Sequence, residues 1–464
     1  MKWYSLILLF LFNSSFGLTV SIKQFGAVGN GISSDNDAFL KASEFINKKK
    51  KNITLLIPAG TYIVGKQEKG LGNSFCAARN LIELTGCSSI QFVFQKGAII
   101  KYANGLLYGS FDPKTQLPYT PKLPFTDKSY AAQLGCFILL QDCSNIQIKN
   151  LVADGNSDNL VIGGRWGDTG IQLAHYGILV VNCSGVQLSG CYLHHFALDG
   201  ISVTNSSTKP ANISILNTKS TYNGRGGLTW LGGNGLRAEN CNFSHTGRGK
   251  ISSSPSCGLD LECENANPIC NGIFKNCTFE NNAGCGIIAD MGPSHHNSFT
   301  DCTFWGVTNW SVWVQKPSYQ FTRCNFYGSF VHGYITTNPE EATRFESCTF
   351  EDKLYKGQEP FGTYLLESDG RKLMYFNQCT FTANKKKVMW YNGSGQSTND
   401  KAQFLNCTIN VKTNALNQGD FYAVMRKMTI DNLSLNLYST KSKNYYLSED
   451  GSSITNLNRK EYSK

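Results

Sequence analysis

A recurring cysteine spacing constrains the fold of this chain more than any other feature of its sequence. Eight cysteines are each followed, two positions later, by a large apolar residue: Cys191, Cys241, Cys277, Cys302, Cys324, Cys348, Cys379 and Cys407. From Cys277 onward the intervals between them are 25, 22, 24, 31 and 28 residues. A repeat of this length, made of short strands separated by Asn and Gly, predicts a β-solenoid.

Side chains of a strand alternate between its two faces, so each cysteine and its apolar partner point the same way. We therefore expect Cys277, Cys302, Cys324 and Cys348 to stack in the interior as small buried hydrophobes. Disulfides are the alternative in a chain with seventeen cysteines, and the two candidate pairs are Cys263–Cys270 and Cys257–Cys285. Polar residues before several cysteines predict tight left-handed turns at Asn240, Asn276, Asp301 and Asn406.

Residues 1–17 have the pattern of a secretory signal. Lys2 is followed by an apolar run over 6–12 and by the small-x-small sequence Ser-Phe-Gly over 15–17. That run is too short to span a membrane, and no other stretch approaches ~18 apolar residues. We expect an exported protein, secreted or periplasmic, without a membrane span and monomeric.

The net charge of the chain is +10, from 43 basic and 33 acidic residues. A lysine-rich solvated surface explains part of this excess, as over 48–51 at the expected end of a helix. An acidic partner is the functional interpretation. The chain has no compact basic-aromatic nucleic-acid motif, so an acidic polysaccharide is favoured over DNA or RNA.

The N-terminal segment carries three consecutive motifs. Residues 25–31 read Phe-Gly-Ala-Val-Gly-Asn-Gly, residues 34–39 read Ser-Asp-Asn-Asp-Ala-Phe, and residues 57–62 read Ile-Pro-Ala-Gly-Thr-Tyr. Between the second and third motifs the pattern predicts a helix over 36–49, with an apolar side formed by Leu40, Ala42, Phe45 and Ile46. A solenoid has an open apolar end, which this helix would cap.

This segment closely resembles the amino-terminal signature of the pectin-lyase-like superfamily. The resemblance implies an all-β fold, a single right-handed parallel β-helix with an N-terminal capping helix. Hydrolases, lyases, epimerases and phage tail proteins share this signature, so it does not select a chemistry. We predict one β-helix domain over 18–410 and a β-rich end region of the same domain over 411–464.

Two central stretches bring acidic residues together. Residues 257–263 read Cys-Gly-Leu-Asp-Leu-Glu-Cys, residues 285–290 read Cys-Gly-Ile-Ile-Ala-Asp, and the two align on their glycines. If they are neighbouring strands, Asp260, Glu262 and Asp290 point outward together. Two carboxyls ~5 Å apart on a dry surface do not both ionise readily, so one pKa rises. A protonated acid beside an ionised base is what glycosidic cleavage needs.

The predicted catalytic residues are therefore Asp260, Glu262, Asp290 and Asp199, the last of which precedes a neighbouring strand. Basic and aromatic residues close to them in the strand alignment are the predicted substrate-binding residues: Arg225, Arg248, Lys250, Trp310, Trp313 and His332. Insertions over 104–134, 155–175 and 243–256 are predicted to line one cleft over the same sheet.

The stretch Asp-Gly-Ile-Ser-Val over 199–203 resembles the Asp-Gly-Ile strand of polygalacturonase-type hydrolases. That family pattern continues with an Asp-Asp pair, a Gly-His-Gly and an Arg-Ile-Lys. Here the next rung reads Gly-Arg-Gly-Gly over 224–227, and the later motifs are absent. Only Asp199 matches, so ordinary polygalacturonase activity is not expected.

Three functions remain open on the sequence. A glycoside hydrolase would use the carboxylates as acid and base and need no cofactor. A polysaccharide lyase or uronate epimerase would bind Ca²⁺ with the same acids and use a basic residue to abstract a proton. A non-catalytic carbohydrate-binding solenoid is the third. Histidine pairs at 194–195 and 295–296 allow a zinc site, but no His-x-Glu-x-x-His-like spacing supports one, so no metal ligands are predicted.

Overall fold

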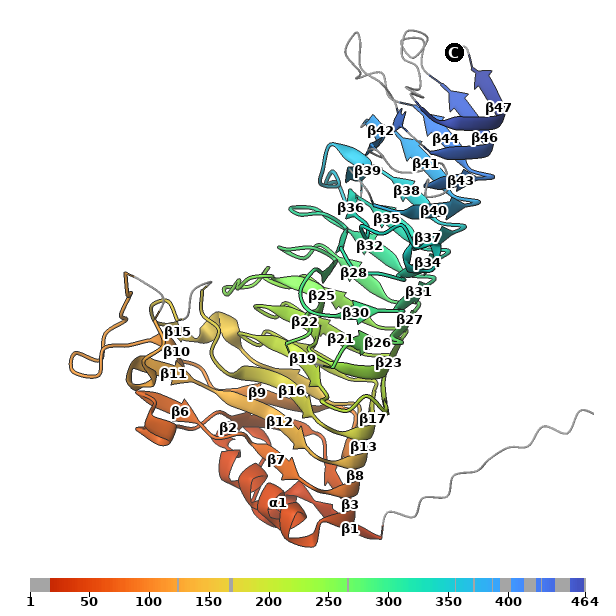
Figure 1. Ribbon diagram of the computed structural model, residues 1–464. Helices are drawn as coiled ribbons and strands as arrows, with labels where there is room; N and C mark the ends of the chain where they lie inside the picture. The colour runs from red at the N-terminus through yellow and green to blue at the C-terminus, as the bar shows by residue number, and fades with distance from the viewer. Residues whose placement is uncertain are drawn as a thin grey trace, which may run out of the picture.

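The computed structural model describes residues 17–122, 125–166, 170–264, 267–354, 356–369, 372–385, 387–392, 402–412, 423–426, 428–438 and 451–462. The predicted signal lies outside these residues except for Gly17. The chain winds into a long β-solenoid, with the helix α1 (Asn36–Lys49) at one end and the C-terminal strands at the other (Figure 1). The predicted β-helix is confirmed.

One face of the solenoid is a parallel twelve-stranded sheet, which carries the predicted site. Its strands, in order, are β7 (Ile82–Thr85), β12 (Gly135–Gln141), β16 (His175–Val181), β19 (Asp199–Thr204), β22 (Gly226–Trp230), β25 (Cys257–Leu261), β29 (Ile287–Ala289), β33 (Val312–Val314), β36 (Phe330–His332), β39 (Tyr364–Asp369), β42 (Lys387–Asn392) and β45 (Ala423–Arg426).

The remainder of each coil contributes to a thirty-stranded sheet, within which two parallel stacks can be followed. The first stack contains β1 (Leu18–Ser21), β3 (Lys51–Ile57), β8 (Ser88–Phe94), β13 (Ser144–Lys149), β17 (Ser184–Ser189), β20 (Pro210–Leu216), β23 (Gly233–Glu239), β27 (Ile273–Lys275), β31 (Ser298–Thr300), β34 (Gln320–Thr322), β37 (Thr343–Glu346), β40 (Met374–Asn377) and β43 (Gln403–Leu405). The second contains β2 (Asn30–Ser34), β4 (Gly60–Val64), β9 (Ala98–Tyr102), β14 (Val152–Asp154), β18 (Tyr192–His194), β21 (Lys219–Thr221), β24 (Asn242–Ser244), β28 (Thr278–Glu280), β32 (Thr303–Trp305), β35 (Asn325–Tyr327), β38 (Thr349–Glu351), β41 (Thr380–Ala383) and β44 (Thr408–Val411).

The cysteine ladder lies in the core, as predicted. Cys277, Cys302, Cys324 and Cys348 are all buried, and the backbone N–H of Cys324 donates to the Sγ of Cys348 on the next coil at 3.4 Å. The phenylalanines two positions on form a stacked column with ring centroids about 5 Å apart, such as the 4.7 Å between Phe326 and Phe350. The interior of the solenoid is therefore built from identical residues repeated on successive coils.

The turns before the cysteines have the expected left-handed backbone. The φ angles are 56° at Asn240, 49° at Asn276, 55° at Asp301 and 53° at Asn406. The side chains also bond along the solenoid, since the Nδ2 of Asn276 donates to the Oδ1 of Asn240 at 2.7 Å. Asparagine tolerates this conformation better than most residues, which explains its recurrence at these positions.

All seventeen cysteines, which lie within the described residues, are free and buried. The candidate disulfides Cys263–Cys270 and Cys257–Cys285 are therefore wrong. The Sγ of Cys263 instead donates to the carbonyl of Asn267. A second, shorter ladder that the repeat analysis did not identify contains Cys87, Cys143 and Cys183.

The helix α1 closes the N-terminal end of the core, as predicted. Phe39 is fully buried and meets the rings of Tyr62 and Phe137 edge-on at 5.9 Å each. The helix also bonds the free edge of the twelve-stranded sheet, since Ser43 and Asn47 exchange hydrogen bonds with β7. Polar side chains of α1 thus occupy edge groups that would otherwise be open to another strand. The apolar side contains Phe39 in place of Leu40, which is half-buried.

Two of the predicted loops, together with residues 67–78, form a small sheet beside the solenoid. It contains β15 (Val161–Ile162), β10 (Leu107–Ser110), β11 (Ala131–Gln133), β6 (Cys76–Ala78) and β5 (Gln67–Lys69), in that order. The insertion over 243–256 contacts the insertion over 155–175, because the Nε2 of Gln172 donates to the carbonyl of Ser254 at 3.1 Å. The insertions therefore lie on the same side of the solenoid; the cleft between them stays a prediction.

The strand ladder continues beyond residue 410. The strands β46 (Thr429–Leu437) and β47 (Ser453–Glu461) pair in parallel over nine residues each, and β46 also pairs with β43 and β44. Among the described residues, no helix has both the length and the apolar character required to cross a membrane.

Candidate functional site

The predicted alignment of the site strands is confirmed by the register of the twelve-stranded sheet. Thr229 of β22 pairs with Asp260 of β25, which pairs with Ile288 of β29, which pairs with Trp313 of β33. The residues on either side of Asp260, Leu259 and Leu261, belong to the core. Asp260 therefore points away from the interior of the solenoid.

Glu262 and Asp290 follow directly after β25 and β29. Pairing of these strands ends at Asp260 and Ile288, two residues before Glu262 and Asp290. The charge of Asp290 acts on the pKa of Glu262, so the two carboxyls lie near each other. Both residues are half-buried, so both carboxyls can reach solvent. The predicted acidic cluster is thus present in the structure, at the C-terminal ends of two adjacent strands.

Asp260 differs from this pair because it is covered. Its exposed fraction is 3%, and among the described residues its Oδ2 has no hydrogen-bond partner. Burial, followed by the neighbouring charge of Glu262, raises the pKa of Asp260 well above its usual range, although Arg225 opposes the rise. The Asp260 carboxyl therefore favours its protonated form and is not presented to a large substrate.

Glu262 is the accessible acid with a perturbed pKa. Burial raises its pKa, followed by the charge of Glu264, with a smaller contribution from Asp290, while Arg225 acts in the opposite direction. Glu264 is exposed and was not identified from the sequence, since it lies beyond the strand where alternation no longer indicates direction. Its position two residues after Glu262 is the signal that could have revealed it.

Asp199 and Arg225 are engaged with each other. The guanidinium of Arg225 donates from Nε to Oδ1 at 3.0 Å and from Nη2 to Oδ2 at 2.7 Å, a two-point ion pair. Asp199 is 0% exposed, so its carboxylate cannot touch a polysaccharide. The predicted catalytic role of Asp199 and substrate-binding role of Arg225 are corrected accordingly: the two side chains bind each other, and the charge of Arg225 opposes the rise in the pKa of Asp260 and Glu262.

Trp310 and Trp313 form the aromatic part of the site. Their ring centroids are 4.5 Å apart, and both side chains are half-buried. His332 is the last residue of β36; its ring meets Trp313 edge-on at 4.1 Å, and its Nδ1 bonds the Nζ of Lys372. This group lies one and two rungs beyond Asp290.

Arg248 and Lys250 are tied into the loops. Arg248 donates to the carbonyls of Asn281 and Asn282 at 3.1 Å each, and the Nζ of Lys250 donates to the carbonyl of Leu160 at 2.7 Å. Both cations thus hold the insertion over 243–256 in place. Their binding to substrate carboxylates stays a prediction.

The comparisons with known proteins agree with this fold. Residues 135–316 match the family described as right handed beta helix region. The chain is a right-handed parallel β-helix, as the N-terminal resemblance implied. A search of curated protein sequences finds no match.

Solved structures with a similar course of the chain have diverse activities. The A-module of the mannuronan C-5 epimerase AlgE6 of Azotobacter vinelandii is 12% identical, with 96% of this chain and 100% of that chain covered and a TM-score of 0.44. The Agl-KA catalytic domain is 16% identical over 96% and 69%, with a TM-score of 0.44. An exopolygalacturonase from Thermotoga maritima is 12% identical over 96% and 92%, with a TM-score of 0.40. A Streptococcus pneumoniae adhesin and a bacteriophage protein are also similar, so these likenesses select no activity.

Proposed function

We propose that this chain is a carbohydrate-active enzyme that hydrolyses glycosidic bonds of an acidic polysaccharide. Glu262 is the general acid, and Asp290 is the second carboxyl, which acts as base or nucleophile. The observation that carries the proposal is the raised pKa of a half-buried Glu262, one strand away from a second accessible carboxyl. Glycosidic cleavage needs one carboxyl that holds a proton and one that does not.

The surroundings of the pair support this assignment. The buried Asp260 lies beside Glu262, and its raised pKa disfavours a further negative charge next to that residue. The tryptophans at 310 and 313 offer apolar ring faces on which a sugar can stack. The acidic nature of the polysaccharide rests on the net charge of +10, and export rests on the predicted signal over 1–17.

The contacts of three cationic side chains weigh against their use as the base in elimination or epimerisation. A lyase needs a base that can take a proton from the sugar ring; a histidine is one candidate, and Arg225, Arg248 and Lys250 are the cationic ones. The charged group of each is hydrogen-bonded to protein, to Asp199 in the first case and to backbone carbonyls in the other two. If Ca²⁺ were needed, Glu262, Glu264 and Asp290 would supply the oxygen ligands that it prefers.

A panel of acidic polysaccharides tests the proposal, read by new reducing ends and by the ultraviolet absorbance of unsaturated uronates. Hydrolysis produces reducing ends without that absorbance. Glu262→Gln should lower turnover by ~10²-fold or more, the typical effect of losing an acid–base group, and Asp290→Asn should do the same. Glu239→Gln, on β23 of the other sheet, is the matched control and should keep full activity.

Each alternative has its own result in this assay. Calcium-dependent absorbance indicates a lyase. A changed C-5 configuration of the uronates, measured by proton NMR without new chain ends, indicates an epimerase. Binding without either change indicates a carbohydrate-binding solenoid. Full activity of purified Glu262→Gln on a substrate that the parent cleaves contradicts the assignment of the acid.

A further inference from the structure

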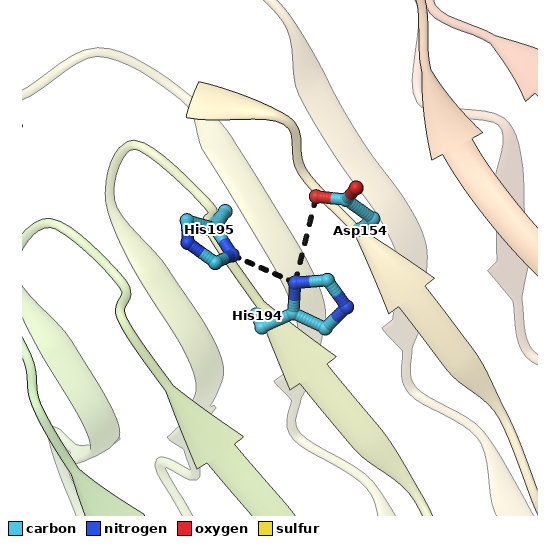
Figure 2. Close-up of side chains that lie close together, drawn as sticks. All are labelled: Asp154, His194 and His195. Atoms are coloured by element: carbon cyan, nitrogen blue, oxygen red, sulfur yellow. Dashed lines mark hydrogen bonds and ion pairs between the residues drawn. The ribbon is translucent and has the colours of Figure 1, made fainter. Parts of the chain in front are cut away.

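A second cluster of side chains lies at the turn before β19, away from Glu262 and Asp290. Asp154 ends β14 and His194 ends β18, and these two residues are paired on adjacent rungs. His195 follows at a left-handed turn with a φ of 55°. Figure 2 shows the three side chains converging, with the Nδ1 of His194 between the Nδ1 of His195 and the carboxylate of Asp154.

The distances suit one bound ion. The Nδ1 atoms of the two histidines are 2.7 Å apart, and the Nδ1 of His194 is 3.5 Å from the Oδ1 of Asp154. One donor atom from each residue lies within 4.8 Å of the other two. Around a tetrahedral Zn²⁺ with bonds of ~2.0–2.2 Å, neighbouring ligand atoms are separated by roughly 3–3.5 Å, so small side-chain adjustments suffice.

We propose that Asp154, His194 and His195 form a binding site for a divalent transition-metal ion, and that Zn²⁺ is the ion it takes. Two imidazole nitrogens and one carboxylate oxygen are the donors that zinc prefers, whereas Ca²⁺ and Mg²⁺ prefer oxygen ligands alone. Three protein ligands leave a fourth position for water or another ligand. All three side chains are half-buried, so an ion can enter from solvent.

An outer layer of contacts already orients the ligands. The Nε2 of His195 faces the Oδ2 of Asp158 at 3.5 Å, which favours a proton on Nε2 and leaves the lone pair of Nδ1 for a metal. Asp158 in turn accepts the backbone N–H of Lys250 at 2.8 Å, and the backbone N–H of Asn156 donates to Asp154 at 2.8 Å. Lys101 approaches the other oxygen of Asp154 at 3.9 Å and leaves Oδ1 to face the histidines.

The chain contains a natural comparison for this site. His295 and His296 also end a strand and enter a turn, with a φ of 55° at His296 and Nδ1 atoms 2.7 Å apart. In the described part of the chain they belong to no group of three potential ligands. The close nitrogen contact is therefore a property of the His-His turn, and the carboxylate on the preceding rung is what makes the first pair a site.

Paired substitutions test this site on the full-length protein. After removal of metal with a chelator, each protein is titrated with Zn²⁺ against a competing colorimetric indicator. His195→Asn and His296→Asn are matched, because Asn tolerates the left-handed turn that both positions occupy. We expect one tight Zn²⁺ per chain in the parent and in His296→Asn, and an affinity at least ~100-fold weaker in His195→Asn. Asp158→Asn, which only orients a ligand, should weaken binding by about 10- to 100-fold.

Two further measurements distinguish zinc binding at this site from binding to cysteines and from a loss of folding in the variants. The visible and near-ultraviolet absorption of the Co²⁺ form distinguishes nitrogen and oxygen ligands from thiolates, so a thiolate charge-transfer band would assign the metal to cysteines and overturn the proposal. Equal Zn²⁺ affinity in His195→Asn and the parent would overturn it as well, as would equal losses in both matched variants. Metal-free unfolding temperatures verify that the variants are folded.

Discussion

At the residue scale, the burial of Asp260 makes the free energy of unfolding depend on pH. Its raised pKa means that the native state holds the proton more tightly than the unfolded chain does. The contribution of Asp260 to the free energy of unfolding is therefore largest below the unfolded pKa of about 3.9. This contribution is lost as the pH rises through the native pKa. Asp260→Asn removes this dependence. The free energy of unfolding of the variant, measured relative to the parent, should therefore be higher at pH 7 than at pH 4. Urea unfolding at both pH values measures the difference.

Asp301→Asn is the control of opposite sign. The guanidinium of Arg323 bonds Asp301 at 2.7 and 2.8 Å and lowers its pKa, so its contribution to stability is present at neutral pH and disappears as the pH falls. This variant should lose stability relative to the parent at pH 7 and match it at low pH. If the Asp260 variant follows the same direction as the Asp301 variant, the buried carboxyl is ionised in the native protein.

The sequence predicts the positions of the acids on their strands, but it does not predict which residues surround them. Alternation and the glycine alignment predict that Asp260 points outward, and the register confirms it. Neither strand alternation nor the glycine alignment can predict that Asp260 is buried, because the residues that bury it are distant in the sequence. The Asp199–Arg225 pair and the Asp154–His194 pair join different rungs, so they become visible only once the coils are placed in register.

At the element scale, the helix α1 covers the N-terminal end of the hydrophobic core. Phe39→Ala removes a fully buried ring that contacts Tyr62 and Phe137, and it should lower the free energy of unfolding by about 3–5 kcal/mol. The exposed Lys41 of the same helix is the matched control, and Lys41→Ala should change stability by less than about 0.5 kcal/mol. Equal effects of the two substitutions would show that α1 does not seal the core.

The bounds of α1 could be predicted from the sequence, but the rotation of the helix about its axis could not. The apolar spacing fixes a helix over 36–49, and the structure has it at Asn36–Lys49. The rotation of the helix about its axis, which buries Phe39 rather than Leu40, depends on the bonds between α1 and β7. Those bonds involve residues some forty positions later, beyond the reach of local periodicity.

At the scale of the whole molecule, the core is a set of repeated columns. Cysteines stack in two ladders, and a second phenylalanine column, which includes Phe274, Phe299 and Phe321, runs beside the one found from the repeat. Each coil contacts mainly its neighbours, so stability accumulates coil by coil. The first phenylalanine column was predictable from the sequence because a cysteine stands two positions before each of its members. The second column lies three positions before each cysteine, where no rare residue draws attention to it.

The chemistry of the cysteines follows from this arrangement and gives a test of the entire solenoid. All seventeen thiols are free and buried, although the predicted signal would send the protein to an oxidising compartment. In the native protein, a thiol-specific reagent such as Ellman's reagent should modify almost none of them within minutes, whereas all seventeen should react in concentrated guanidinium. A reducing agent should leave the unfolding temperature unchanged, because no disulfide constrains the unfolded chain. A lower unfolding temperature in reductant, or fewer than seventeen reactive thiols after denaturation without it, would mean that the ladder contains disulfides and that the columns are cross-linked rather than packed.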